Sequence, residues 1–170
     1  MKDSKQQNDF LELLKPVLKN LEKYSLALTH DREKAKELAA DTIAAAWESF
    51  GKLNDKQAFL SYLFTIASRK FSEQIKIEIK RRELSEADIS QLYAGGISPE
   101  DASDITLLYD ALNKLDENTR QALILAEIIG IKQDEVAKIQ GAGLSAVKMR
   151  IKRGKEKLRE LLGIKIKHSI

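Results

Sequence analysis

Residues 133–162 read QDEVAKIQGAGLSAVKMRIKRGKEKLRELL. The first part predicts a short helix, because Val136, Ala137 and Ile139 recur at the spacing of one helix face. A tight glycine turn follows at residues 141–143, and a longer basic helix begins near residue 144. A short helix, a turn and a second helix form the order of a helix-turn-helix. This segment therefore predicts a module that binds DNA.

The basic helix is expected to bury one face and expose another. Its apolar residues recur every three or four positions, and they are Leu144, Val147, Ile151, Gly154, Leu158 and Leu161. An α-helix fits the major groove of B-DNA, where its side chains contact base edges and flanking cations contact phosphates. We therefore expect the DNA-binding residues to be Ser145, Lys148, Met149, Arg150, Lys152, Arg153 and Lys155. The alternative is a solvated amphipathic helix whose lysines only keep the chain soluble.

Helical periodicity extends along most of the chain, and glycine and proline are scarce. Only 8 Gly and 2 Pro occur among 170 residues, too few for the many turns of a sandwich or a barrel. The fold class is therefore expected to be all-α. Helices are predicted over residues 10–28, 31–50, 56–82, 99–115, 117–129, 133–139 and 144–162.

Local signals set the ends of several of these helices. Pro16 interrupts the first, because proline has no backbone N–H to donate. Asp31 is a good N-cap for the second helix, and Asn54 stands three residues before Gln57 in a capping arrangement for the third. Gly130 is expected to stop the helix over 117–129.

Charge is distributed unevenly, which predicts two small helical domains. Residues 69–82 contain six Lys or Arg against two Glu, and residues 144–159 contain seven against one. Between them, residues 83–110 contain seven acidic residues and no basic one. The expected division is a first domain over 1–82, an acidic flexible linker over 83–98 and a second domain over 99–170. The alternative is that the acidic stretch is an ordinary polar surface loop.

Several function classes are excluded by composition. The chain has no Cys and only two His, so it cannot build a thiolate zinc site, a disulfide framework or a cysteine active site. Its acidic residues form no convincing metal-ligand or acid-base set, so we expect no metal, no cofactor and no enzyme. No apolar run approaches the roughly 18 residues of a membrane span, and the start MKDSKQQNDF has no apolar signal segment. We expect a cytoplasmic protein without membrane insertion.

Two stretches of the sequence resemble one protein family. The segment ALNKLDENTRQALILAEIIGIKQDEVAKIQGAGLSAVKMRIKRGKEKLRELL is similar to region four of the extracytoplasmic-function (ECF) sigma factors of bacterial RNA polymerase. The residues in register with that family are Leu115, Arg120, Gly130, Glu135, Val136, Ala137, Val147, Lys148 and Arg150. The segment FLELLKPVLKNLEKYSLALTHDREKAKELAADTIAAAW resembles region two, and FLSYLFTIASRKFSEQIKIEIKRR resembles the basic helix that follows it.

The sequence also departs from the family pattern at a few positions. Asp116 replaces the usual proline, Gly143 occupies the usual serine cap, and Ala146 stands for threonine. Tyr62 and Arg69 stand where the family often has tryptophan and asparagine.

The resemblance implies a sigma factor that binds RNA polymerase core, directs it to promoter DNA and helps to open the duplex without covalent chemistry. Many members of the family also bind an inhibitory anti-sigma factor. The second domain would recognise the minus-35 element through its basic helix. The residues implied to contact the polymerase are Glu37, Leu38, Asp41 and Thr42.

The first domain would bind the minus-10 element. Its loop over residues 51–57 resembles the family's pocket for an extruded base, and the basic helix after it would hold the separated strand. The residues implied are Lys52, Asn54, Lys56, Arg69 and Lys70. Trp47 and Tyr62 could be stacking platforms, although the position of Trp47 on an apolar stripe favours core packing.

Two other classes remain open from the sequence. A helix-turn-helix regulator that is not a polymerase subunit would share the last four helices and use the first domain for dimerisation or ligand sensing. A helical adaptor without nucleic-acid contact would need none of the basic side chains for its activity.

Overall fold

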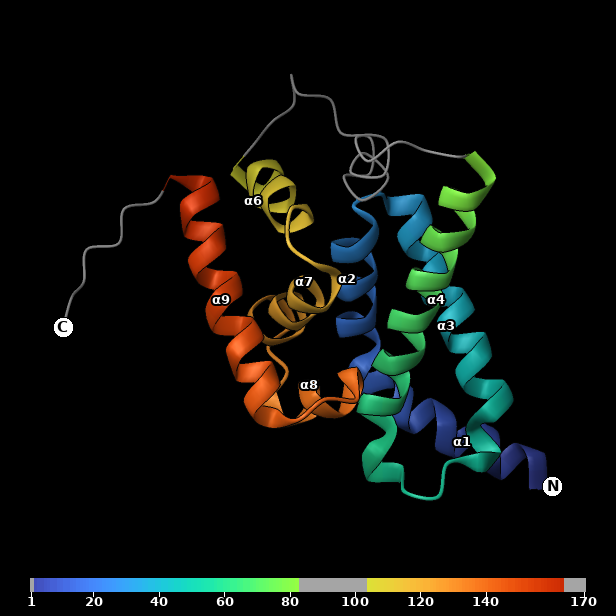
Figure 1. Cartoon of the computed structure of the whole chain (residues 1–170). Helices are drawn as coiled ribbons and strands as arrows, with labels where there is room; N and C mark the ends of the chain where they lie inside the picture. The colour runs from blue at the N-terminus through green and yellow to red at the C-terminus, as the bar shows by residue number, and fades with distance from the viewer. Residues whose placement is uncertain (1, 83–103, 164–170) are drawn as a thin grey trace. The chain divides into compact units, whose positions relative to one another are not determined.

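The computed structural model describes residues 2–82 and 104–163, and these residues form helices and turns without a β-strand (Figure 1). The chain divides into two compact units, Met1–Arg82 and Glu83–Ile170. The prediction of an all-α fold with two helical domains is confirmed. The linker predicted over 83–98 and the helix start predicted at residue 99 lie outside the described residues.

The first unit is a helical bundle. Its helices are α1 (Lys2–Leu14), α2 (Leu18–Thr29), α3 (Arg32–Ser49) and α4 (Phe59–Arg82). Helices α2, α3 and α4 pack on one another around a core in which Leu21, Leu38 and Leu63 have no exposed surface. The rings of Tyr24 and Phe64 lie 5.3 Å apart in the same core. Burial of these apolar faces drives the packing of the three helices.

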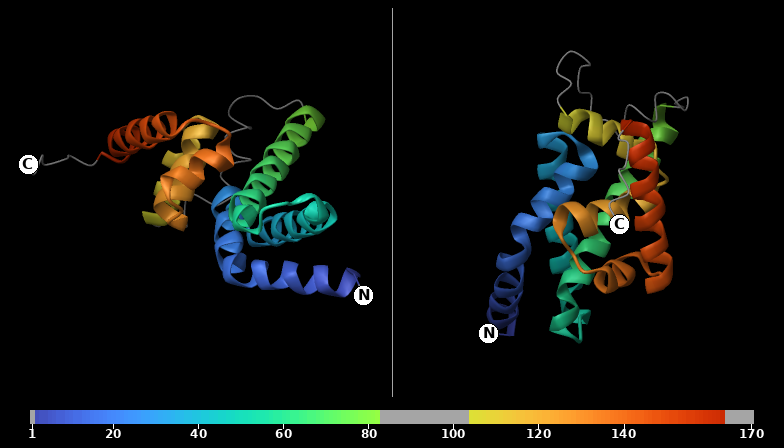
Figure 2. Two further views of the ribbon diagram at one scale, coloured as in Figure 1. Left: turned by 90° about the horizontal axis from the view of Figure 1, so that it is seen from below. Right: turned by 90° about the vertical axis from the view of Figure 1, so that its left-hand side faces the viewer.

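Pro16 lies in a 3-10 turn, Lys15–Val17, that separates α1 from α2. The two helices meet at an angle there (Figure 2, left). Proline cannot donate to the helical hydrogen-bond ladder, which explains the interruption. The interruption predicted from the sequence is therefore confirmed.

The cap predicted for α3 is also confirmed, whereas the one predicted for α4 is wrong by one residue. The Asp31 carboxylate accepts hydrogen bonds from the backbone N–H groups of Glu33 at 2.9 Å and Lys34 at 3.1 Å. Asp55, not Asn54, caps the 3-10 turn Lys56–Ala58 that leads into α4, because its carboxylate accepts from the N–H of Gln57 at 2.9 Å.

The second unit consists of short helices that pack against one side of a long C-terminal helix. Its elements are α6 (Asp104–Asn113), α7 (Glu117–Leu123), a π-helical segment (Ile124–Ile129), α8 (Gln133–Gln140) and α9 (Leu144–Leu162). Helices α6, α7 and α8 all pack against α9. Gly130 ends the π-helical segment at φ 84°, in the left-handed region that glycine adopts without strain, so the predicted stop is confirmed.

Helix α9 buries three of the six residues of its predicted apolar stripe, and Leu158 and Leu161 are half-buried. Val147, Ile151 and Gly154 are buried, but Leu144 is 41% exposed, so its predicted place in the core is wrong. Leu144 is the first residue of α9, and Cβ atoms in a helix point back toward its N-terminus. Its side chain therefore projects past the start of the helix, where the described residues leave it exposed.

Candidate nucleic-acid interface

The outward face of α9 presents basic and polar side chains to solvent. The buried residues Val147 and Ile151 fix the orientation of the helix. The residues opposite them are all exposed: Ser145, Lys148, Met149, Lys152 and Arg153. The predicted exposure of this face is therefore correct, and an α-helix with an exposed face can enter a major groove.

Two cations predicted for the same face are engaged within the second unit. Arg150 donates from Nη1 to Oε1 of Gln140 at 2.8 Å, which joins α9 to the end of α8. Lys155 Nζ lies 2.8 Å from Oε1 of Glu127 in the π-helical segment. Both side chains therefore brace α9, and Arg150 is only partly exposed.

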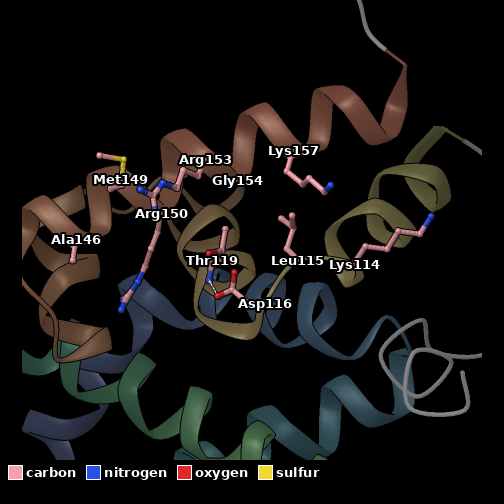
Figure 3. A pocket seen from close by; sticks show the side chains of 10 residues that line it. All are labelled: Lys114, Leu115, Asp116, Thr119, Ala146, Met149, Arg150, Arg153, Gly154 and Lys157. Atoms are coloured by element: carbon pink, nitrogen blue, oxygen red, sulfur yellow. Dashed lines mark hydrogen bonds between the residues drawn. The ribbon is translucent and has the colours of Figure 1, made fainter. Parts of the chain in front are cut away.

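A pocket of about 600 Å³ lies beside this face, between α9 and the turn that joins α6 to α7 (Figure 3). The α6–α7 side contributes Lys114, Leu115, Asp116 and Thr119, and α9 contributes Ala146, Met149, Arg150, Arg153, Gly154 and Lys157. Four of these residues are cationic. Lys114 was not predicted from the sequence, because only the fold brings the end of α6 beside α9.

The single acid of this pocket has a structural role. Asp116 is the N-cap of α7, and its Oδ2 accepts a hydrogen bond from the N–H of Thr119 at 3.1 Å (Figure 3). A carboxylate at this position stabilises the first turn of a helix. Aspartate therefore replaces the usual proline of the family motif with another residue suited to a helix start.

In the first unit, the predicted minus-10 residues fall into two groups. Lys52, Asn54 and Lys56 are exposed in the loop between α3 and α4. Arg69 is exposed and Lys70 partly exposed farther along α4. Arg69 lies ten positions after Phe59, the first residue of α4, which is about 15 Å along the helix. The structure thus divides these residues between the loop and α4 and does not gather them in a single pocket.

Lys56 is engaged by the first helix. Its Nζ lies 2.7 Å from Oδ2 of Asp9 in α1. The hydrogen bond from Lys56 lowers the pKa of the Asp9 carboxyl below its ordinary value; desolvation opposes this, and attraction to Lys56 and Lys5 adds to it. Lys56 retains exposed surface on the side away from Asp9, since its side chain is 59% exposed.

Trp47 and Tyr62, the two candidates for base stacking, differ in their exposure to solvent. Trp47 is 39% exposed, and its ring packs against Phe10 at 5.3 Å and Phe50 at 6.4 Å between centroids. It is thus part of an aromatic cluster at the surface, not of the closed core. The Tyr62 hydroxyl donates to the carbonyl of Ala46 at 2.7 Å and hydrogen-bonds to Ser49, so this ring is anchored to the end of α3.

The polymerase patch predicted on α3 needs a correction. Glu37 and Asp41 are exposed, but Leu38 and Thr42 are completely buried. The Thr42 hydroxyl donates to the carbonyl of Leu38 at 2.7 Å, which satisfies it inside the core. Leu38 and Thr42 therefore cannot contact a partner in this fold. Helical periodicity, which places both residues on the apolar stripe of α3, correctly predicts that they are buried.

No group of three or more His, Cys, Asp or Glu that could hold a metal ion occurs within 2–82 and 104–163. The described helices also include none whose length and hydropathy would suit a membrane crossing.

Comparisons with known proteins match both units. Residues 12–78 match the family model of sigma-70 region 2, and residues 105–158 match that of sigma-70, region 4. The RNA polymerase sigma factor CarQ of Myxococcus xanthus is 30% identical over 132 residues, which cover 76% of this chain and 75% of CarQ. The ECF RNA polymerase sigma factor EcfG of Rhodopseudomonas palustris (strain TIE-1) is 27% identical, covering 84% of this chain and 79% of EcfG.

A solved structure shows a similar fold over nearly the whole chain. It is that of the sigma factor RpoE in complex with the anti-sigma factor NepR from Bartonella quintana. The TM-score is 0.70 at 25% identity, and the alignment covers 98% of this chain and 100% of RpoE.

Proposed function

This chain belongs to the extracytoplasmic-function sigma factors of bacterial RNA polymerase, and we propose which of its residues contact the promoter and the polymerase. As a sigma factor it binds RNA polymerase core, directs it to specific promoters and assists initiation. A helix-turn-helix regulator that acts apart from the polymerase is not favoured, because the match to region 2 accounts for the first unit as well.

Helix α9 contacts the minus-35 element through its exposed face. Lys148, Lys152 and Arg153 supply cations on the side opposite the buried Val147 and Ile151, and this arrangement is the main support for the proposal. Lysine and arginine bind guanine edges and phosphates, and the methyl end of Met149 suits a thymine methyl group. The cationic pocket beside this face would receive a backbone phosphate.

The loop between α3 and α4 takes a base extruded from the minus-10 element. Lys52 and Asn54 are among its exposed polar side chains, and Trp47, at the end of α3, is partly exposed. Arg69 and Lys70 lie farther along α4, where they would hold phosphates of the separated strand. Unpaired bases stack on aromatic side chains, whereas the phosphates of the strand pair with cations. The loop residues and the α4 cations therefore have different roles.

The polymerase contacts α3 through Glu37 and Asp41. Both carboxylates are exposed on one side of the helix, and a basic surface on the polymerase would complement them. An anti-sigma factor is a further proposed partner, because the structural neighbour RpoE was solved with one. The chain would act in the cytoplasm, where the polymerase works, and supply binding energy and specificity without catalysis.

A binding experiment with core polymerase tests the α3 patch. Glu37→Lys with Asp41→Lys should strongly weaken retention of the full chain on immobilised core enzyme. Glu22→Lys on the exposed side of α2 is the matched control and should be retained like the parent. Normal retention of the doubly reversed chain would exclude this patch as the docking site.

A further inference from the structure

Helix α1 packs against both ends of the loop that joins α3 to α4. Phe10 is 4% exposed, and its ring meets Phe50 at 5.1 Å and Phe59 at 5.7 Å between centroids, both edge to face. Phe50 lies just before the loop and Phe59 just after it. Figure 1 shows α1 crossing the ends of α3 and α4 where this loop lies. One aromatic side chain of α1 therefore holds the two ends of the loop together.

Two polar side chains on the same face of α1 approach the loop itself. Asp9 Oδ2 accepts from Lys56 Nζ at 2.7 Å, near the end of the loop. Near its beginning, a Cβ added to Gly51 would come within 3.1 Å of Gln6 Nε2. Gln6, Asp9 and Phe10 are three and four residues apart, the spacing that places side chains on one helix face.

The loop's own hydrogen bonds are short in range. The N–H of Leu53 donates to the carbonyl of Phe50 at 3.0 Å, and the N–H of Ala58 donates to that of Asp55 at 3.0 Å. These bonds form one turn at each end and leave Asn54 exposed between them. The angle between the two turns therefore depends on contacts from outside the loop, and α1 supplies such contacts at both turns.

We propose that Asp9 and Gln6 of α1 are positioning residues that set the shape of this loop, and through it the base preference at the minus-10 element, without touching DNA. Lys56 then acts mainly as the tether for Asp9 rather than as a contact to the strand. This inference rests on the proposed role of the loop in taking an extruded base.

The experiment measures promoter preference with reconstituted holoenzyme. Full-length variants are combined with core polymerase and assayed on promoter libraries randomised at the minus-10 element or at the minus-35 element. Asp9→Ala and Lys56→Ala should each reduce discrimination at one minus-10 position by roughly two- to five-fold, the range expected for losing one exposed ion pair. Preference at the minus-35 element should not change, and Glu12→Ala on the same helix is the control.

A charge exchange separates positioning from simple stabilisation. Asp9→Lys combined with Lys56→Asp should restore the preference, because the reversed pair can hold the loop in the same place. If the exchanged pair does not restore it while Asp9→Ala and Lys56→Ala both reduce it, Lys56 contacts DNA and the tether role is wrong. An equal loss of initiation on every promoter, with preference intact, would also overturn the proposal.

Asn54→Ala distinguishes a failure of this inference from a failure of the proposed loop function. If Asn54→Ala alters minus-10 preference and Asp9→Ala does not, the loop contacts the base but α1 does not position it. If neither variant alters the preference, the loop does not recognise the base, and both proposals fail. Thermal unfolding of each variant accompanies the assay, so that a destabilised first unit is recognised as such.

Discussion

Gly154 of α9 lies so close to Leu123 of α7 that a Cβ on the glycine would come within 2.6 Å of the leucine Cδ1. Thr119 Cγ2 would lie 2.7 Å away on the same side. Glycine at this position lets α7 pack directly on α9, and that packing fixes which face of α9 is exposed. The close approach therefore connects a core position to the DNA-binding surface.

Replacing this glycine should destabilise the second unit. Gly154→Ala gains about 1 kcal/mol of helix propensity but forces two buried side chains apart, and overpacking costs about 1 to 3 kcal/mol. The alanine Cβ would lie well inside normal van der Waals distance of Leu123 and Thr119. We therefore expect the free energy of unfolding to fall by about 1 kcal/mol, measured by denaturant unfolding. Glu156→Ala on the exposed side of α9 is the control and should stay within about 0.5 kcal/mol of the parent. Unchanged or higher stability of Gly154→Ala would contradict the close packing.

The cations of α9 should differ in their effect on promoter binding. Lys148→Gln and Lys152→Gln should each weaken binding of holoenzyme to minus-35 duplex. Each should also make the decline of log binding constant with log salt concentration less steep, by about 1 in the slope. Lys155→Gln is the matched control, because Lys155 pairs with Glu127 and should change the slope less. Fluorescence anisotropy across a salt series measures the slopes, and equal slopes for all three variants would contradict this assignment of the face.

The N-cap of α3 should contribute to the stability of the first unit. Asp31→Ala removes the acceptor for two backbone N–H groups and should cost about 1 kcal/mol. Asp31→Asn retains an acceptor oxygen and should recover most of the loss. Chemical denaturation of the full chain, followed through Trp47 fluorescence, reports this unit. Equal stability of the alanine variant and the parent would show that the cap is unimportant.

The ion pair between Asp9 and Lys56 should lower the pKa of the Asp9 carboxyl. The lowered pKa of Asp9 means that its contribution to stability is fully present above the ordinary value of 3.8 and is lost as the pH falls through the lowered value. NMR titration of the Asp9 carboxyl should therefore give a pKa below 3.8 in the parent and a higher one in Lys56→Met. A Lys56→Met chain with the parent pKa would show that the two side chains do not interact in solution.

Much of the fold could be predicted because its signals are local. The Asp31 cap, the Pro16 interruption and the Gly130 stop each depend on backbone chemistry within a few residues. Leu38 shows how two signals can disagree: helical periodicity predicted a buried residue, whereas the family resemblance implied a polymerase contact. The structure agrees with the periodicity, since a period of 3.6 residues determines which side chains face the core.

Other features could not be predicted, because they depend on contacts between distant parts of the chain. Lys155 and Glu127 are far apart in sequence, and only the packing of α9 brings them together. The pairing of Asp9 with Lys56 is of the same kind. The charge of a lysine is visible in the sequence, but whether a neighbouring carboxylate already neutralises it is not.

Reconstituted transcription tests the central claim most directly. The full chain is added to purified core polymerase with a library of genomic fragments, and transcript starts are mapped. A sigma factor predicts starts at discrete positions that share two spaced sequence elements, with the minus-35 element lost as a determinant in a chain carrying Lys148→Gln and Lys152→Gln. Starts as scattered as those from core enzyme alone would contradict the account.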